Sequence, residues 1–203
     1  KERIEKERIE KERIERIEKE RIEKERIEKV SISQLPKFFW TNLNKSNERR
    51  INMEQQFDKY NINNFRIEAY DGSDQNFENL FKINKVNLKE NNLEIACLLS
   101  HLKAIQNCIN DEDEYYIICE DDIVISSETF KQDIINAIND APIFDILMLH
   151  KTVNELQYKA IIDKYTKWNN KIYSCVLYVI SKEGINKIKQ KYDIINNVYH
   201  LKH

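Results

Sequence analysis

The sequence is poor in the residues and motifs that mark several large enzyme classes. Its 203 residues include only two glycines and two prolines. It has no GxGxxG, GxxxxGK[ST], HExxH or GxSxG pattern. Dinucleotide oxidoreductases, P-loop NTPases, zinc proteases and serine hydrolases depend on those patterns to place a phosphate, a metal or a nucleophile. Their absence argues against all four classes.

Long apolar runs and a strong charge of one sign are also missing. No run approaches the ~18 apolar residues of a membrane span, and the N-terminus lacks the apolar region of a signal peptide. The formal charge is only −2, from 33 Lys and Arg against 35 Asp and Glu. Such a balance gives no electrostatic case for a nucleic-acid partner. We expect a soluble, cytoplasmic protein without a transmembrane segment.

The cysteines form no CxxC pair, and each has apolar neighbours in the sequence. This pattern favours buried free thiols in a reducing compartment over a zinc site. The cysteines are Cys97, Cys108, Cys119 and Cys175.

Residues 1–29 are a repeat of KERIE units that contains only Lys, Arg, Glu and Ile. Opposite charges fall three and four residues apart, and each such pair stabilises an isolated helix by about 0.2–0.5 kcal/mol. Successive isoleucines are mostly five residues apart, which turns them around a helix and leaves no coiled-coil seam. We predict a charged, solvated helix or a disordered segment, with a spacer or docking helix as the functional alternative.

Residues 30–203 have the length and apolar content of one domain with a core. Predicted strands alternate with predicted helices, which indicates an α/β sandwich with a largely parallel sheet. The strands are expected at Leu35–Leu43, Phe65–Tyr70, Tyr115–Cys119, Phe144–Leu149 and Tyr173–Ile180, and the helices at Glu48–Tyr60, Glu94–Ile109, Thr129–Ile138 and Lys182–Tyr192.

The segment with the most chemical information is an acidic triplet, Glu120, Asp121 and Asp122, directly after an apolar strand. Three adjacent carboxylates repel one another unless solvent or a cation neutralises them. Oxygen-rich acidic sites suit Mg²⁺ or Mn²⁺, which often bridge to phosphates. The triplet therefore indicates either a metal-assisted nucleotide-sugar site or a solvated acidic turn.

Two further candidates follow the first and second predicted strands. Arg49 and Arg50 stand in the opening turn of a helix, where guanidinium groups and free backbone N–H groups can bind phosphate. On spacing alone, a pair of solvated arginines is the better explanation. Asp71 precedes Gly72 and can bond a ribose hydroxyl, or the two residues can form a plain turn.

The strongest predicted helix carries Glu94, Cys97 and His101 on one face. Glu94 could orient or deprotonate an acceptor hydroxyl, and His101 could do the same because its pKa is ordinarily near neutrality. The alternatives are a helix-capping glutamate and a structural histidine. Asp145, at the start of a strand, is a further candidate or a turn acid.

Several segments together resemble glycosyltransferase family 25, which includes bacterial lipopolysaccharide glycosyltransferases and procollagen galactosyltransferases. They occur in family order over nearly all of residues 36–190. The segments are Phe39–Arg50, similar to a strand followed by "LxxSxxRR"; Glu68–Gly72, similar to "xAxDG"; Glu94–His101, similar to "ExxCxxSH"; Glu120–Asp122, at the "EDD" position; Phe144–Leu149, similar to "xDILxL"; and Tyr178–Gly184, similar to "YxISxxGA" with Ile185 in the alanine position.

The resemblance implies a GT-A-like, Rossmann-like sandwich that binds a UDP-sugar and a divalent cation, usually Mn²⁺. The expected activity is transfer of a hexose, galactose or glucose, to a hydroxyl of a glycan or protein. Glu120 and Asp122 are expected to contact the metal and the donor, and Arg49 and Arg50 to lie near the nucleotide. Asp121, the middle acid of the motif, is expected to be catalytic, together with Glu94 and His101.

Family members continue past the "YxISxxGA" segment, whereas this chain ends at His203. The resemblance therefore predicts a sandwich truncated at its C-terminus, in which His200 or His203 could supply a missing contact. The alternative function is a catalytically incomplete member that binds a nucleotide sugar or a protein partner.

Overall fold

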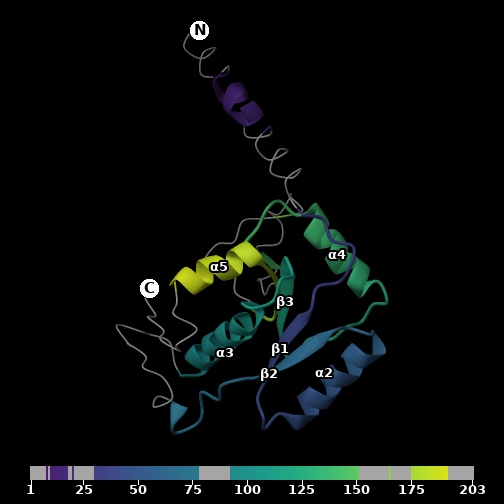
Figure 1. Ribbon diagram of the computed structural model, residues 1–203, viewed down its shortest axis with the longest axis vertical. Helices are drawn as coiled ribbons and strands as arrows, with labels where there is room; N and C mark the ends of the chain where they lie inside the picture. Colours follow the sequence, from purple (N-terminus) through teal and green to yellow (C-terminus); the bar gives the residue numbers. More distant parts are fainter. Residues whose placement is uncertain are drawn as a thin grey trace.

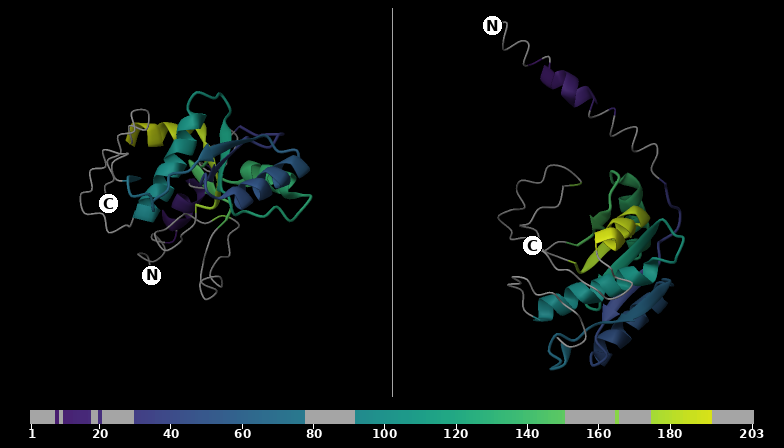
Figure 2. Two further views of the ribbon diagram at one scale, coloured as in Figure 1. Left: turned by 90° about the horizontal axis from the view of Figure 1, so that it is seen from below. Right: turned by 60° about the vertical axis from the view of Figure 1, so that its left-hand side comes forward.

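The structure is a computed structural model that describes residues 8, 10–17, 20, 30–77, 92–150, 165 and 175–191. Within the repeat, residues 10–17 are helical, and their side chains are exposed. Arg8 pairs with Glu12, and Arg13 pairs with Glu10. Ile14 and Ile17 are 58% and 52% exposed, so neither forms an apolar seam. This helix stands clear of the α/β domain (Figures 1 and 2).

The domain is built on a five-stranded sheet in the order β2-β1-β3-β5-β4. β1 pairs in parallel with β2 and with β3, while β5 runs antiparallel to β3 and to β4. The sheet is therefore largely parallel, as predicted from the sequence, and β5 is the one reversed strand. The strands are β1 (Phe38–Asn42), β2 (Asn64–Glu68), β3 (Tyr115–Glu120), β4 (Ile146–Met148) and β5 (Leu177–Ser181).

Helices cover both faces of the sheet, with α3 and α5 on one side and α2 and α4 on the other (Figure 1). Successive side chains of a strand point to opposite faces, so β1 places Phe39 under α3 and both Phe38 and Trp40 under α2. Strands buried on both faces read as continuous apolar runs, as β1 and β3 do. The helices are α2 (Asn47–Lys59), α3 (Asn92–Cys108), α4 (Phe130–Asp140) and α5 (Lys182–Lys191).

All nine predicted elements of residues 30–203 are present, but some boundaries differ. β4 and β5 are shorter than predicted, because apolar side chains pack on the core from outside the strands: Phe144 and Leu149 beside β4, and Val176 before β5. Ser46 directly precedes α2, but its side chain makes no capping hydrogen bond. In the described part of the chain, no helix is both long and apolar enough to cross a membrane.

The start of α5 fits tightly against the residue that precedes β4. Ser181 caps the helix, because its Oγ accepts a hydrogen bond from the N–H of Gly184 at 3.0 Å. A Cβ on Gly184 would lie 2.4 Å from the carbonyl oxygen of Asp145. The glycine is therefore needed for this close approach. The Asp145 side chain is exposed and pairs with Lys187 at 2.7 Å, which favours the structural interpretation of this acid.

Substitution Gly184→Ala should lower the free energy of unfolding by about 1–3 kcal/mol, because the new methyl group overpacks a rigid backbone contact. Asn186→Ala, at an exposed position of the same helix, is the matched control and should change it by at most about 0.5 kcal/mol. Urea unfolding followed by circular dichroism measures both. Equal stability of the two variants would contradict this packing.

Candidate functional site

The carboxyl ends of β1 and β3 are the place where a ligand is expected in this fold. After β1 the chain continues to β2 at one edge of the sheet, and after β3 it continues to β4 at the opposite edge. Such a reversal opens a crevice between the loops that follow two adjacent parallel strands. The β1 loop leads into α2, and the β3 loop begins with the acidic triplet.

Asp121 joins these two loops. Its side chain is only 10% exposed, and it accepts a hydrogen bond from Arg49 at 3.0 Å. Its other oxygen accepts one from the amide of Asn42 at 2.6 Å. The pKa of Arg49 is raised, chiefly by the hydrogen bond with Asp121. A buried carboxylate is costly unless it is paired, so these contacts hold the β1 loop and the β3 loop together at the crevice.

A pocket with a volume of about 200 Å³ lies at this crevice. It is lined by segments that are far apart in the sequence: the β1 loop, the start of α2, the loop after β2, the start of α3 and the end of β3. Its polar lining includes Arg49, Asp71, Ser100, Glu120 and Asp121. Four predicted site residues thus line one pocket.

The Asp71 loop closes one side of the pocket. Asp71 pairs with Lys45 and also accepts hydrogen bonds from the N–H and hydroxyl of Ser73, at 3.0 and 2.6 Å. Ser100 on α3 accepts a hydrogen bond from the N–H of Tyr70 at 2.9 Å. A Cβ on Gly72 would lie 2.4 Å from the carbonyl oxygen of Asn92. The loop is therefore held against the start of α3.

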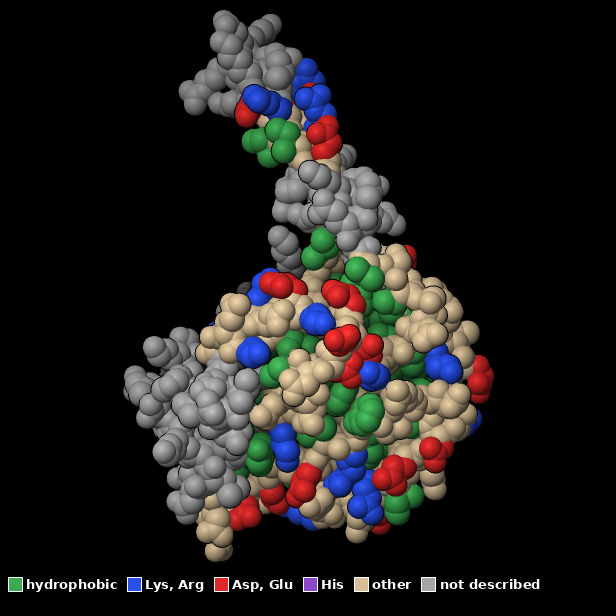
Figure 3. Space-filling model, viewed as in Figure 1, with side chains coloured by type: hydrophobic (Ala, Val, Ile, Leu, Met, Phe, Trp, Pro, Cys, Tyr) green, Lys and Arg blue, Asp and Glu red, His purple; other side chains and the backbone are tan. Residues whose placement is uncertain are grey.

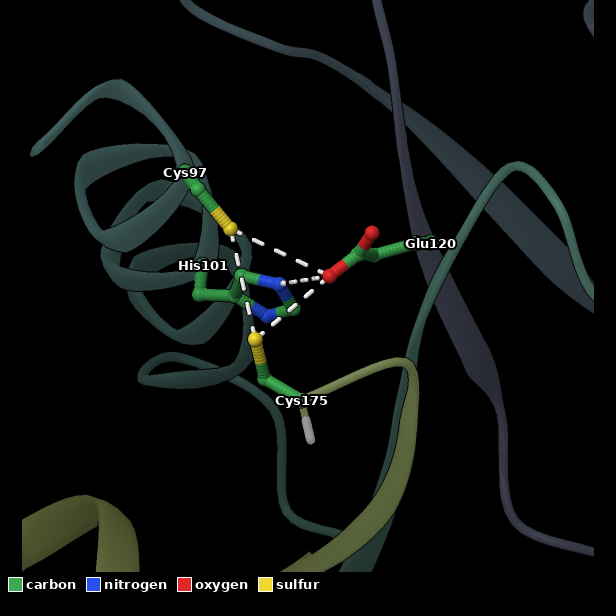
Figure 4. Close-up of side chains that lie close together, drawn as sticks. All are labelled: Cys97, His101, Glu120 and Cys175. Atoms are coloured by element: carbon green, nitrogen blue, oxygen red, sulfur yellow. Dashed lines mark hydrogen bonds and ion pairs between the residues drawn. The ribbon is translucent and has the colours of Figure 1, made fainter. Parts of the chain in front are cut away.

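A second group of side chains meets at the floor of the pocket. Cys97 and His101 come from α3, Glu120 from the end of β3, and Cys175 from the segment before β5, and they point towards one another (Figure 4). One ligand-type atom from each lies within 4.8 Å of all the others. Cys97 and Glu120 also line the pocket.

His101 and Glu120 form an ion pair in this group when no metal is bound. Burial lowers the pKa of His101, but Cys175 and Glu120 raise it, and the result is about 9. The pKa of Glu120 is lowered, chiefly by its close approach to His101. The pKa of Cys97 is also lowered, chiefly by the hydrogen bond with Cys175. The expectation of four buried thiols holds for Cys108 and Cys119 but is wrong for the other two, which are partly exposed.

Other predicted residues lie outside the pocket lining. Asp122 is exposed beside it, and Glu94 is exposed in the first turn of α3. Arg50 lies 3.8 Å from Glu54 on the same helix. His101 is 6% exposed and reaches the pocket only through its neighbours Cys97 and Glu120. His200 and His203 fall outside the described residues.

Sequence reasoning did not identify Asn42 or Cys175 as parts of the site. Asn42 is a polar residue at the end of a fully buried strand, and this position is a usable signal. Cys97 and His101 are four residues apart on a helix, a spacing that brings two ligands together. Cys175 has no comparable signal, because only the fold brings it to α3.

The family model described as "Glycosyltransferase family 25 (LPS biosynthesis protein)" matches residues 35–199. The chain belongs to glycosyltransferase family 25. Among curated proteins, none matches this chain.

Family membership places the chain among glycosyltransferases, and the motifs acquire structural roles. In the "ExxCxxSH" segment, Ser100 anchors the loop after β2, while Cys97 and His101 contact the strand-end acid. In the "YxISxxGA" segment, Tyr178 bonds His101, and Ser181 caps α5. Most of these motifs thus meet at the carboxyl ends of β1 and β3, whereas Ser181 lies beside Tyr115 at the other end of β3.

Asp121→Ala should lower the free energy of unfolding by about 1–3 kcal/mol, because it removes the closer of the two acceptors of the buried Asn42 amide. Asp122→Ala changes an exposed carboxylate of the same size and should alter stability by at most about 0.5 kcal/mol. Chemical denaturation of both variants measures the difference. A larger loss in Asp122→Ala would overturn the assignment of Asp121 as the buried member.

Asp71 should give a pH-dependent contribution to stability. Its pKa is lowered from 3.8 to about 2, chiefly by the hydrogen bond with Lys45 and then by those with Ser73. A lowered folded-state pKa stabilises the protein above the unfolded value, and this contribution is lost as the pH falls from about 4 to about 2. The stability difference between wild type and Asp71→Asn should therefore shrink over that window. A difference that stays constant down to pH 2 would refute the pairing.

Proposed function

We propose that the chain transfers a hexose, galactose or glucose, from a UDP-sugar to a hydroxyl of a glycan or protein acceptor. The observation that carries the proposal is the pocket between the ends of β1 and β3, which gathers Arg49, Asp71 and Glu120 from distant segments. The diphosphate of a nucleoside diphosphate is bound by cationic groups and N–H donors, and the hydroxyl groups of a sugar or ribose are bound by carboxylates. The pocket offers both kinds of group.

Arg49 is suited to the diphosphate. Its guanidinium carries five N–H donors, and the hydrogen bond to Asp121 uses NH1. The side chain is 59% exposed, so the same group can also meet a phosphate. It lies in the first turn of α2, where backbone N–H groups and the helix dipole favour an anion. Asp121 thus acts as a positioning residue for the guanidinium.

The carboxylates at the end of β3 fit a hard divalent cation such as Mn²⁺. Glu120 directs one oxygen at the cysteines and His101, and its second oxygen points away from them (Figure 4). Asp122 is exposed two residues further on. These two carboxylates would hold the cation, which would offset the charge that develops on the leaving UDP. Both oxygens of Asp121 are already bonded within the protein.

The acceptor hydroxyl requires a base or an orienting group near the donor sugar. Glu94 and His101 remain the predicted residues for this part. Glu94 lies in the exposed first turn of the helix whose residues Leu93 and Cys97 line the pocket, so it is accessible to an acceptor. His101 is buried and hydrogen-bonded to Tyr178, so it is better placed to hold Glu120 than to meet a hydroxyl.

Asp122→Ala should reduce transfer by more than about 100-fold, because it removes a carboxylate from the proposed cation site. The assay follows UDP release from UDP-galactose and UDP-glucose with Mn²⁺, with simple glycosides and hydroxylysine peptides as acceptors. Glu128→Ala, an exposed acid after the same strand, is the control and should keep wild-type turnover. Unchanged turnover in Asp122→Ala would reject the cation assignment.

Calorimetry with UDP and Mn²⁺ separates this proposal from its alternative. UDP binding together with UDP release from a donor supports the transferase. UDP binding without release from any UDP-hexose favours a catalytically incomplete member that binds nucleotide sugars. No binding of UDP contradicts both.

A further inference from the structure

The group of Cys97, His101, Glu120 and Cys175 has a donor set that sugar-nucleotide binding does not require. Mn²⁺ and Mg²⁺ prefer carboxylate, carbonyl and water oxygens, whereas thiolates and imidazole select zinc. Two thiols, an imidazole and one carboxylate oxygen therefore suit a different ion from the one expected beside a diphosphate. We propose that these four side chains form a tetrahedral zinc site, which goes beyond the proposed transferase function.

The spacing of the ligand atoms fits a tetrahedron around zinc. With Zn–S at ~2.3 Å and Zn–N or Zn–O at ~2.1 Å, tetrahedral angles give S···S edges of about 3.8 Å, S···O edges of about 3.6 Å and N···O edges of about 3.4 Å. The two sulfurs are 4.0 Å apart, and the Cys97 and Cys175 sulfurs lie 3.8 and 3.4 Å from Oε1 of Glu120. Nε2 of His101 lies 3.5 Å from the same oxygen. All four ligand atoms lie within 4.8 Å of one another, so side-chain shifts of up to about 1 Å would complete the site.

The histidine supplies an independent observation. His101 is 6% exposed, and its Nε2 has no hydrogen-bond partner among the described residues. The 3.5 Å approach to Glu120 is an ion-pair distance without hydrogen-bond geometry. A buried polar atom without a hydrogen bond is costly, and here it faces three other potential ligands. A metal ion would satisfy it.

The other ring nitrogen is already held in the way that a metal ligand requires. Nδ1 of His101 lies 3.1 Å from the hydroxyl of Tyr178, which is itself buried. When Nδ1 donates to this hydroxyl, Nε2 carries the lone pair that a metal needs. Metal-bound histidines almost always donate their second N–H to a neighbouring acceptor in this manner. Tyr178 is therefore a positioning residue for the site.

The site would tie together three parts of the fold. Cys97 and His101 are one helical turn apart on α3, Glu120 ends β3, and Cys175 precedes β5. Four protein ligands leave no open position, which is typical of structural rather than catalytic zinc. Zinc would displace the protons of Nε2 and of both thiols. Because zinc would bind Oε1 of Glu120, the second carboxylate oxygen of this residue stays available to the pocket.

The test uses the full chain, without an affinity tag, kept reduced and stripped with a chelator. After incubation with Zn²⁺ and dialysis, elemental analysis should find about one zinc ion per chain, as expected for one closed four-ligand site. The Co²⁺-loaded protein should show the visible bands of tetrahedral Co²⁺ and a thiolate-to-metal charge-transfer band. Reduction removes a Cys97–Cys175 disulfide as a competing state.

Variants identify the ligands. The double variant Cys97→Ser with Cys175→Ser should lose the charge-transfer band and bind zinc at least about 100-fold more weakly, because both thiolates are removed. Tyr178→Phe keeps all four ligands and should weaken zinc about 10-fold through loss of the second hydrogen bond. Cys108→Ala, a buried thiol outside the group, is the control and should bind like wild type. Circular dichroism confirms that each variant is folded.

Two results would overturn the site. One is a folded, reduced wild-type chain that retains no zinc and gives no thiolate–Co²⁺ band. The other is a double variant that holds zinc as tightly as wild type, which would place the metal elsewhere. Neither depends on sugar transfer, so a chain that binds zinc but releases no UDP keeps the zinc site and loses only the transferase proposal.

Discussion

The buried carboxylate of Asp121 is the contact on which the site depends. It lies between the loops that follow β1 and β3, and it binds Asn42 at the end of one strand and Arg49 on the helix that follows. Burial makes an unpaired carboxylate costly, so the two loops and the guanidinium are held together by the need to satisfy it. On the face of the domain drawn in Figure 3, basic and acidic side chains are interspersed.

The three acids of the triplet take different positions because they continue the alternation of β3. Ile118 packs beneath α3, and Cys119 packs on the opposite face. Glu120 accordingly turns to α3, where it meets His101, and Asp121 turns to the α2 side. Asp122 lies beyond the strand and is exposed. One short acidic run thus presents Glu120 to α3, Asp121 to the crevice and Asp122 to solvent. Both glycines of the chain stand where two backbone segments approach closely. A Cβ at Gly72 or at Gly184 would lie 2.4 Å from a backbone oxygen.

Much of the fold could be predicted from the sequence, and the reasons are physical. β1, β3 and α3 are read easily because strands buried on both faces are continuous apolar runs, and a helix under a sheet keeps an apolar stripe. The ends of β4 and β5 were harder, because side chains such as Phe144 pack on the core without belonging to a strand. The acidic triplet, Arg49 and Asp71 were identified, but their separate roles were not. Those roles depend on which face each side chain takes, and Cys175 reaches α3 only through the pairing of β5 with β3.

The central claim is that the crevice between β1 and β3 binds the nucleotide part of a sugar donor. A crystal structure of the chain with UDP and Mn²⁺ tests it most directly. We expect the diphosphate beside Arg49 at the start of α2, with the cation on the carboxylates that end β3 and the nucleoside towards the Asp71 loop. UDP bound elsewhere on the domain, with this pocket containing only water, would contradict the account.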